Sequence, residues 1–229
     1  MDIGLIQRAF TYFVAMLFCL TFHEAAHALA AKWQGDTTAE DEGRLSLNPL
    51  VHLDILGTVV LPLIGALGSM PMLGWAKPVP VNPRNFKSVW GNVLVAVAGP
   101  GSNLLLCAIC LFVLVIAQKT GITSTGFAHL TSPFVKLLEA MVGVNAILAV
   151  FNMIPLPPLD GAAVLEVVLP RDWVRVYEER VAPYGIFILF LLAFSGGLGW
   201  IAGLAQAYIH LTSIFVSLVV GAIANVLGF

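Results

Sequence analysis

The chain is organised around residues 21–31, which read TFHEAAHALAA. This stretch contains the pattern His-Glu-x-x-His inside an apolar segment that we expect to be helical. On a helix, residues four positions apart lie about 40° apart around the axis, so His23 and His27 project from one face. Two imidazoles placed in this way can bind one Zn²⁺ ion, and Glu24 beside them can act as a general base. Such groups in a lipid-depth helix are costly, which favours a functional role over a chance match.

The composition of the chain is that of an integral membrane protein. Of its 229 residues, 59% are hydrophobic and only 10% are charged, and the mean hydropathy is +0.93. Soluble domains average about 25% charged residues, so this composition excludes a soluble globular protein. The length permits one domain with short loops. The formal net charge of −2 excludes the basic surface that nucleic-acid binding requires.

Long apolar segments predict the membrane spans. We expect full spans at about residues 10–31, 91–117 and 134–154. Two more are expected within residues 181–229, which carry no charged side chain and are divided by the glycines of residues 195–199.

Two further segments are harder to assign. Residues 34–50 are polar and rich in turn residues, which indicates a short β-hairpin. Residues 53–75 are apolar and long enough to span, but their glycines and prolines break helices. They either cross once as a kinked helix or enter and return. The predicted fold class is an all-α polytopic membrane protein with about five full transmembrane helices.

A catalytic zinc site needs a third protein ligand and an open position for water. The candidates for this ligand are His52, Asp54, Glu139, Asp160 and Glu166. Asp160 is the best placed, because it follows a span that proline breaks, and broken backbone at membrane depth implies access to water. His52 and Asp54 follow the first span closely, so they compete with Asp160 for the role of third ligand. Asp54 could instead hydrogen-bond a zinc-bound histidine.

Three motifs, in order, resemble those of the site-2 protease family of intramembrane zinc metalloproteases. H-E-x-x-H lies at residues 23–27, the small-residue motif of the middle core helix at Gly99-Pro100 with Asn103, and N-x-x-P-x-P-x-L-D-G at residues 152–161. The last motif is the most specific, and the resemblance covers residues 21–161. Residues 74–83 are similar to those of the minimal prokaryotic members, and we find no inserted PDZ-like or CBS-like domain.

The resemblance implies a set of site residues. His23, His27 and Asp160 bind one Zn²⁺ ion per chain, and Glu24 activates the water. Asn152 lines the site and helps to hold the substrate carbonyl. The sequence leaves open whether His52 or Asp54 also contributes to the metal site.

The requirement that His27 and Asp160 bind the same zinc determines the topology expected for residues 53–75. His27 and Asp160 each lie at or past the exit end of a span, so both reach one metal only if those two helices are parallel. With one full crossing between them, residues 53–75 must return to the side they left, as a re-entrant segment. Basic residues agree, because eight lie on the zinc-bearing side and three on the other. Since cytoplasmic loops carry the excess of Lys and Arg, we expect the active site to face the cytoplasm.

These features predict a zinc-dependent intramembrane endopeptidase that acts in regulated intramembrane proteolysis. We expect residues 1–229 to form a single domain, with a catalytic core at about 10–168 and C-terminal helices at about 181–229. Its partners are the lipid bilayer and transmembrane protein substrates, without nucleic acid. The sequence leaves open the substrate, the cleavage site, the trigger and the formation of homo-oligomers. Two alternatives are a membrane metal transporter, which would need ligands strung along a pathway, and a catalytically inactive membrane scaffold.

Overall fold

The computed structural model describes residues 3–62, 74–121 and 128–227 of the chain. These residues form helices and connecting loops, and none of them lies in a β-strand, which confirms the all-α fold class.

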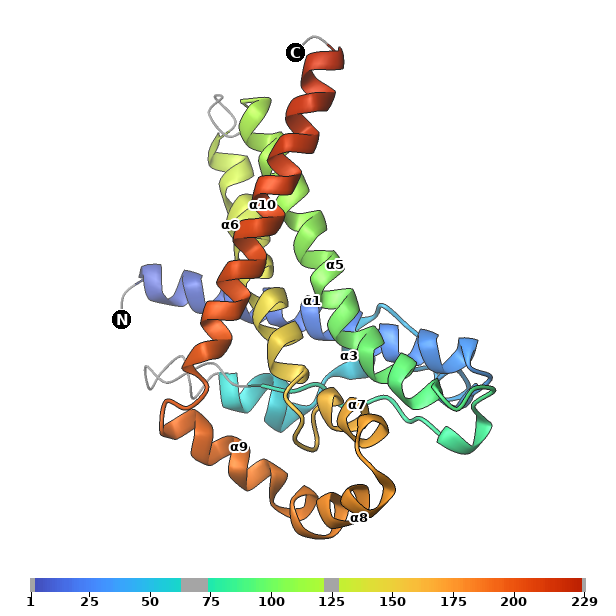
Figure 1. Cartoon of the computed structure of the whole chain (residues 1–229). Coiled ribbons are helices and arrows are strands. Elements are labelled where there is room, and N and C mark those ends of the chain that lie inside the picture. The colour runs from blue at the N-terminus through green and yellow to red at the C-terminus, as the bar shows by residue number, and fades with distance from the viewer. Residues whose placement is uncertain (1–2, 63–73, 122–127, 228–229) are drawn as a thin grey trace.

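Four of the described helices are long and apolar enough to cross a membrane. They are α1 (Ile3–Trp33), α5 (Gly91–Lys119), α6 (Ala128–Asn152) and α10 (Gly199–Leu227). Helices α5, α6 and α10 pack against one another and stand upright in Figure 1. Helix α1 packs on α5 and α6 but passes across their lower parts. This crossing brings the histidines of α1 against the first half of α5.

Shorter helices connect these four and form the region before α10. They are α2 (Thr38–Asp41), α3 (Pro49–His52), the π-helix η1 (Ile55–Val60), the 3₁₀ helices η2 (Pro83–Asn85) and η4 (Ala182–Tyr184), α7 (Asp160–Val168), α8 (Arg171–Arg180) and α9 (Gly185–Phe194). In Figure 1, α7, α8 and α9 form an arc below α5 and α6 that leads back to α10.

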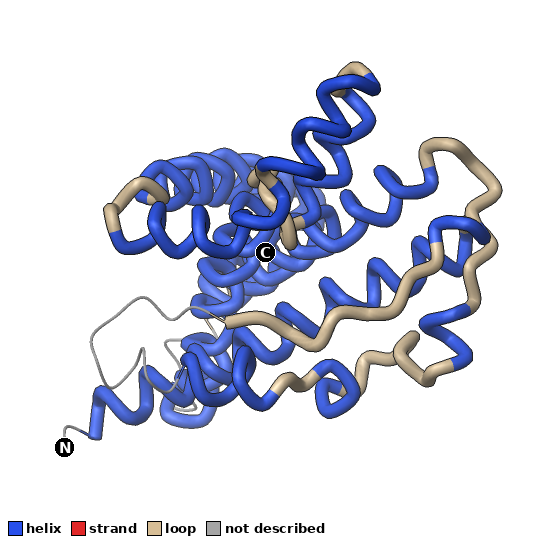
Figure 2. Tube along the Cα trace, turned by 90° about the horizontal axis from the view of Figure 1, so that it is seen from below, coloured by secondary structure: helices blue, strands red, loops and turns tan. Residues whose placement is uncertain are grey.

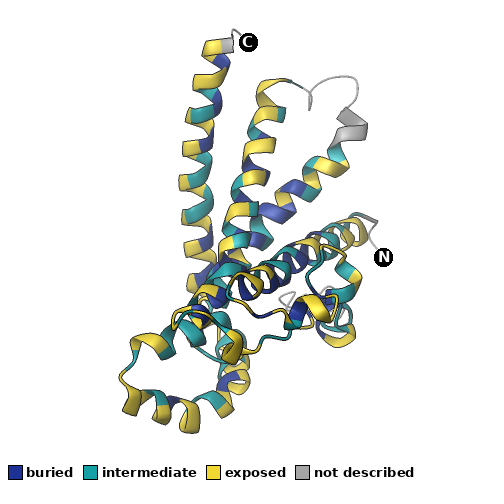
Figure 3. Ribbon diagram, turned by 90° about the vertical axis from the view of Figure 1, so that its right-hand side faces the viewer, coloured by how far each residue is buried: buried dark blue, intermediate teal, exposed yellow. Residues whose placement is uncertain are grey.

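Small side chains fill the centre of the bundle. Cys19 of α1, Cys107 and Cys110 of α5, Ala146 of α6 and Ala205 of α10 are buried in one cluster, and the three cysteines are free thiols. Small residues let helix backbones approach closely within a membrane. The outward faces of the long helices are largely exposed (Figure 3) and carry many of the large apolar side chains, as lipid contact requires.

The fifth expected span is not confirmed. It corresponds to α9, which has only 10 residues. At 1.5 Å per residue such a helix is about 15 Å long, roughly half of the ~30 Å hydrocarbon thickness. The chain turns soon after its end at Gly196, which has a positive φ of 77°.

The hairpin expected over residues 34–50 is wrong, because this segment contains α2 and folds around a buried carboxylate. Both oxygens of Asp36 accept hydrogen bonds: Oδ1 from the N–H and hydroxyl of Thr38 and from Nδ2 of Asn85, and Oδ2 from the N–H of Asn82. Burial raises the pKa of Asp36, but these hydrogen bonds outweigh burial and hold the pKa below its usual value. The loop is thus fixed by one side chain, not by a strand ladder.

The re-entrant expectation for residues 53–75 depends on residues 63–73, which lie outside the described part of the chain. The ends on either side of them meet. The N–H of Trp75 donates to the Gly57 carbonyl at 3.2 Å, and the Thr58 hydroxyl donates to the Trp75 carbonyl at 2.9 Å. From there, residues 74–82 form a long loop without helical turns that runs beside α1 (Figure 2).

Candidate metal centre

Two histidines of α1 and the first residue of α7 meet in the interior. His23 and His27 are one turn apart and only 4% and 7% exposed. The Asp160 carboxylate lies 3.2 Å from Nε2 of His23 and 3.3 Å from Nε2 of His27, and the two Nε2 atoms are 3.0 Å apart. Within the described residues, these three side chains form the one group of His, Cys, Asp or Glu close enough to hold a metal ion.

The other ring nitrogens determine which atoms are free to bind a metal. Nδ1 of His23 lies 2.7 Å from Oδ1 of Asn103, and Nδ1 of His27 lies 2.7 Å from the Val95 carbonyl. Both partners are acceptors, so each Nδ1 carries a hydrogen, and a ring in its neutral form then presents the lone pair of Nε2. Two lone pairs that face each other at 3.0 Å repel unless a cation lies between them. The arrangement therefore fits a bound metal.

The separations also match the size of a zinc site. Four ligands at ~2.0–2.1 Å from Zn²⁺ form a tetrahedron whose edges are about 3.3–3.4 Å long. Here the two Nε2 atoms are 3.0 Å apart, His23 Nε2 is 3.2 Å from Oδ2 of Asp160, and His27 Nε2 is 3.3 Å from Oδ1 of the same carboxylate. Oδ2 of Asp160 is buried and has no hydrogen-bond partner. A metal ion would satisfy this buried oxygen.

Two hydrogen-bonded amide side chains, Asn103 and Asn145, orient the His23 ring through its Nδ1. Asn103 and Asn145 are fully buried, and Nδ2 of Asn103 donates to Oδ1 of Asn145 at 2.8 Å and to the Cys19 carbonyl at 3.2 Å. Asn145 in turn donates to the Met141 carbonyl. These bonds fix the orientation of the Asn103 amide, so its oxygen faces the imidazole. Asn103 belongs to the middle-helix motif of the sequence, but the sequence did not show that it orients a metal ligand.

Two glycines allow the helices to come close enough to form the site. A Cβ at Gly99 of α5 would collide with the rings of His27 and His23. A Cβ at Gly161 of α7 would collide with the backbone of Met153 and Ile154. The glycines beside Pro100 and after Asp160 therefore have a steric role at the centre.

Glu24 lies next to the ligands without belonging to the metal-binding group. Its Oε2 accepts a hydrogen bond of 2.9 Å from the N–H of Val79, in the loop that runs beside α1. The side chain is buried and lines the same cavity as the three ligands. A buried carboxylate at this cavity is a candidate proton acceptor.

A large cavity opens at these residues. Its volume is about 860 Å³, and it is lined by His23, Glu24, His27, Asp160 and Asn152 together with mainly apolar side chains. Helix α9 contributes to its wall through Ile186 and Phe190, among others. Asn152 donates its Nδ2 to the Leu148 carbonyl at 3.0 Å. The cavity has the size and the apolar character of a site for a hydrophobic ligand.

The rival third ligands lie elsewhere. Nε2 of His52 is 2.8 Å from the Ser46 carbonyl, and Asp54 accepts from the N–H of Gly57 at the start of η1. Glu139 is exposed on α6. Glu166 lines the cavity but stands almost two turns beyond Asp160 on α7. Burial, with a contribution from Glu178, raises the pKa of Glu166.

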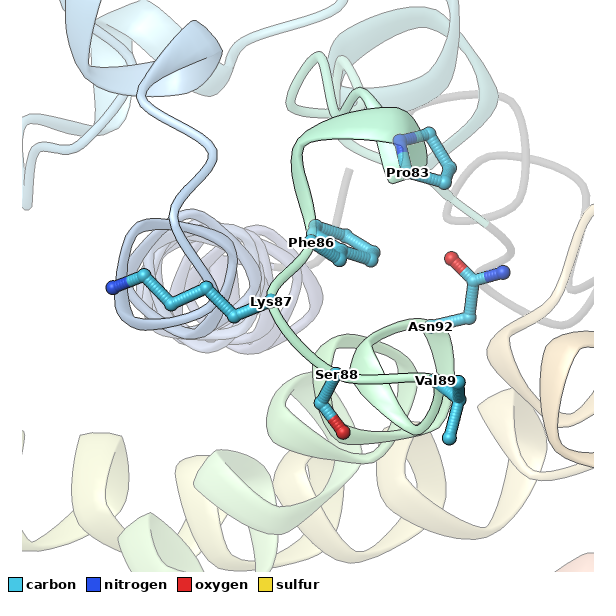
Figure 4. A pocket seen from close by; sticks show the side chains of 6 residues that line it. All are labelled: Pro83, Phe86, Lys87, Ser88, Val89 and Asn92. Atoms are coloured by element: carbon cyan, nitrogen blue, oxygen red, sulfur yellow. The ribbon is translucent and has the colours of Figure 1, made fainter.

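A smaller hollow of about 310 Å³ adjoins the cavity at Phe86 and Asn92, which line both. Figure 4 shows its lining residues, with the Lys87 side chain directed away from Phe86 and Asn92. No carboxylate, imidazole or thiol lines it, so it offers no set of metal ligands.

Comparison with known proteins gives the family. The sequence profile of Peptidase family M50 matches residues 11–196. The chain belongs to this family. It is 40% identical over 192 residues to "Putative zinc metalloprotease YwhC" of Bacillus subtilis (strain 168), a match that covers 81% of this chain and 80% of that protein. Membership in this family, which includes the site-2 proteases, confirms the resemblance found in the sequence and makes the chain a membrane metalloprotease.

More distant relatives carry a similar name. The chain is 30% identical over 151 residues to "Putative zinc metalloprotease Rip2" of Mycolicibacterium smegmatis, covering 66% of this chain and 54% of that protein. It is 29% identical over 203 residues to the Rip2 protein of Mycobacterium tuberculosis (strain H37Rv), covering 86% and 72%. No solved structure matches the chain.

Proposed function

We propose that the chain is a zinc-dependent intramembrane endopeptidase, with His23, His27 and Asp160 as zinc ligands and Glu24 as the general base. The observation that carries this proposal is the convergence of three metal-binding side chains beside a buried glutamate, at the wall of an apolar cavity. Zinc is supported by the names of the relatives and by the ligand separations. The whole chain acts as one catalytic domain.

The reaction uses a small number of groups. When bound, Zn²⁺ supplies Lewis acidity, which polarises a carbonyl and makes a water molecule easier to deprotonate. Glu24 accepts the proton of the attacking water and delivers it to the leaving nitrogen. The N–H of Val79 holds Oε2 of Glu24, which leaves Oε1 for proton transfer. Asn152 lines the cavity and can donate its Nδ2 to the substrate carbonyl.

The substrates are transmembrane segments of other membrane proteins. The cavity is mainly apolar and is partly walled by α9, itself an apolar helix. A substrate helix satisfies its own backbone hydrogen bonds and must unwind before its peptide bonds can be attacked. We therefore expect preferred cleavage near glycine, proline or other helix-weakening residues.

The topology that fits this function has residues 53–75 re-entrant and the site open to the cytoplasm. The contact of Trp75 with Gly57 supports it, because both ends of the segment lie at one place. Single cysteines at Gln34 and Asn85, in a background without the native cysteines, should both resist an impermeant thiol reagent applied from outside cells. Labelling of only one of them would contradict the topology.

The decisive test separates zinc binding from chemistry. Glu24→Gln keeps the volume of the side chain but removes the proton acceptor, so it should retain zinc while cleavage of a transmembrane substrate falls by at least ~10²-fold. His23→Ala should lose both zinc and cleavage. Glu42→Gln, an exposed glutamate, is the matched control and should behave as wild type.

Each alternative function gives a different result in this test. A metal transporter would carry zinc across vesicle membranes without cleaving the substrate. A scaffold would cleave nothing in either form. Wild-type cleavage by Glu24→Gln, in protein that a chelator still inactivates, would assign the general base to another residue.

A further inference from the structure

Arg44 is a buried cation whose partners are carbonyl groups. It lies in the loop between α2 and α3 and is only 6% exposed. Its Nη2 donates to the carbonyl of Lys77 at 2.6 Å and to the carbonyl of Pro78 at 3.2 Å. Its Nε is buried without a hydrogen-bond partner, and none of the ion pairs among the described residues includes it. Burying a charge without a counter-ion is costly, so this arrangement needs a reason.

The second carbonyl belongs to the peptide that holds the general base. The Pro78 carbonyl accepts from Arg44, and the N–H of the same peptide unit, that of Val79, donates to Oε2 of Glu24. A peptide unit is planar and carries a dipole of ~3.5 D. Arg44 lies at its negative end and the Glu24 carboxylate at its positive end. Each contact therefore polarises the peptide in the direction that strengthens the other.

The neighbouring prolines leave no substitute for this contact. Pro78 and Pro80 have no N–H, so Val79 supplies the one amide hydrogen of residues 78–80. The N–H of Lys77 is already bonded to the His52 carbonyl at 2.8 Å. If the segment shifts, no adjacent amide can take the place of Val79 beside Glu24.

We propose that Arg44 is a positioning residue for peptide hydrolysis: it fixes the Pro78–Val79 peptide, and through that peptide it holds the Glu24 carboxylate in the orientation needed for proton transfer. This inference rests on the proposed function of Glu24. Arg44 itself touches neither substrate nor metal. This positioning role explains why a cation is buried against two backbone carbonyls, with no acidic partner, beside the catalytic cavity.

The test uses the full-length zinc enzyme in detergent and a fluorescence-quenched peptide that carries an apolar, glycine- and proline-containing transmembrane segment. Arg44→Gln should lower kcat by ~10–100-fold, the scale for a displaced catalytic group, with KM within about twofold and one zinc per chain retained. Arg44→Lys restores a cation and should recover part of the loss. Arg84→Gln removes an exposed arginine of η2 and should leave kcat unchanged.

A double-mutant cycle shows whether the effect passes through the peptide. Val79→Pro removes the N–H, and Val79→Ala keeps it as the matched control. If Arg44 acts through this N–H, then Arg44→Gln should change kcat by less than about twofold in the Val79→Pro background, because coupled residues are not additive. An undiminished effect of Arg44→Gln in that background would overturn the proposal.

Hydrogen exchange gives a readout that is independent of cleavage. In Arg44→Gln, exchange at the Val79 amide should become faster, while the Lys77 amide bonded to His52 keeps its protection. If Arg44→Gln fails to fold, the same measurements on Arg44→Lys decide the question. Unchanged kcat and unchanged Val79 exchange in a folded Arg44 variant would refute the role of Arg44 alone. Full activity of Glu24→Gln would instead refute the proposed function.

Discussion

Replacing Asn103 should separate metal affinity from folding stability. Its oxygen orients the His23 imidazole, and its Nδ2 donates to Asn145 and to the Cys19 carbonyl. Asn103→Ala removes all three contacts. Asn103→Asp keeps an acceptor for the histidine but loses the two donations. The pair of variants therefore tests the histidine contact apart from the other two.

The magnitudes follow from these contacts. Loss of the outer partner of a metal-bound histidine lowers metal affinity by ~10–100-fold, which corresponds to ~1.4–2.8 kcal/mol of binding free energy. Each buried polar group left without a partner costs ~1–3 kcal/mol, and Asn103→Ala leaves two of them, the Nδ1–H of His23 and Oδ1 of Asn145. The Cys19 carbonyl keeps its hydrogen bond within α1. The free energy of unfolding of the zinc-free protein should then fall by roughly 2–6 kcal/mol. Asn103→Asp should show the stability loss but keep zinc affinity within about tenfold of wild type.

Zinc affinity can be measured by competition with a chelator of known affinity, and stability by thermal melting of the zinc-free protein in detergent. Asn145→Ala is the matched control, because it disturbs the amide chain but leaves the contact between Asn103 and His23. Wild-type zinc affinity in Asn103→Ala, together with reduced stability, would refute the reasoning and assign Asn103 to packing alone.

Three further predictions concern the metal ligands, the helix approach and the loop carboxylate. Asp160→Asn should lose most bound zinc in metal analysis, whereas Asp54→Asn should keep it, because Asp54 caps η1 instead of facing the histidines. Gly99→Ala should lose zinc and cost ~1–3 kcal/mol of stability by overpacking, while Gly101→Ala, which has open space around its Cβ position, should do neither. Since the folded-state pKa of Asp36 is lowered, its stabilising contribution is present at neutral pH and is lost as the pH falls through that pKa. Asp36→Asn should remove this part of the acid sensitivity in thermal melts.

The sequence was sufficient to predict which three side chains meet at the centre of the candidate metal site. His23 and His27 are four residues apart on one helix, a local relation that helical periodicity determines. Asp160 is distant in sequence, but it lies in a long motif that contains several fixed residues. The structure brings these three side chains together, and family membership agrees with the resemblance.

The expectations that failed depend on contacts between distant segments. The polar residues 34–50 suggested turns and a hairpin, but one carboxylate, that of Asp36, ties this loop to residues 82–85. No local pattern indicates such a bond. The contacts of Arg44 with the Pro78 carbonyl and of Val79 with Glu24 are of the same kind, since backbone groups leave no mark in the sequence. The fifth span is not confirmed because α9 has only 10 residues, and hydrophobicity alone does not show where a helix ends.

The distance along the chain between His27 and Asp160 has a consequence for the time course of synthesis. The histidines are in the first long helix, and the carboxylate follows the third. At ~5–20 residues per second of translation, Asp160 emerges on the order of ten seconds after His27. During that interval the new chain has two of its three proposed metal ligands and cannot hydrolyse the proteins beside which it is being inserted. Catalytic competence therefore arises only once most of the chain has been made.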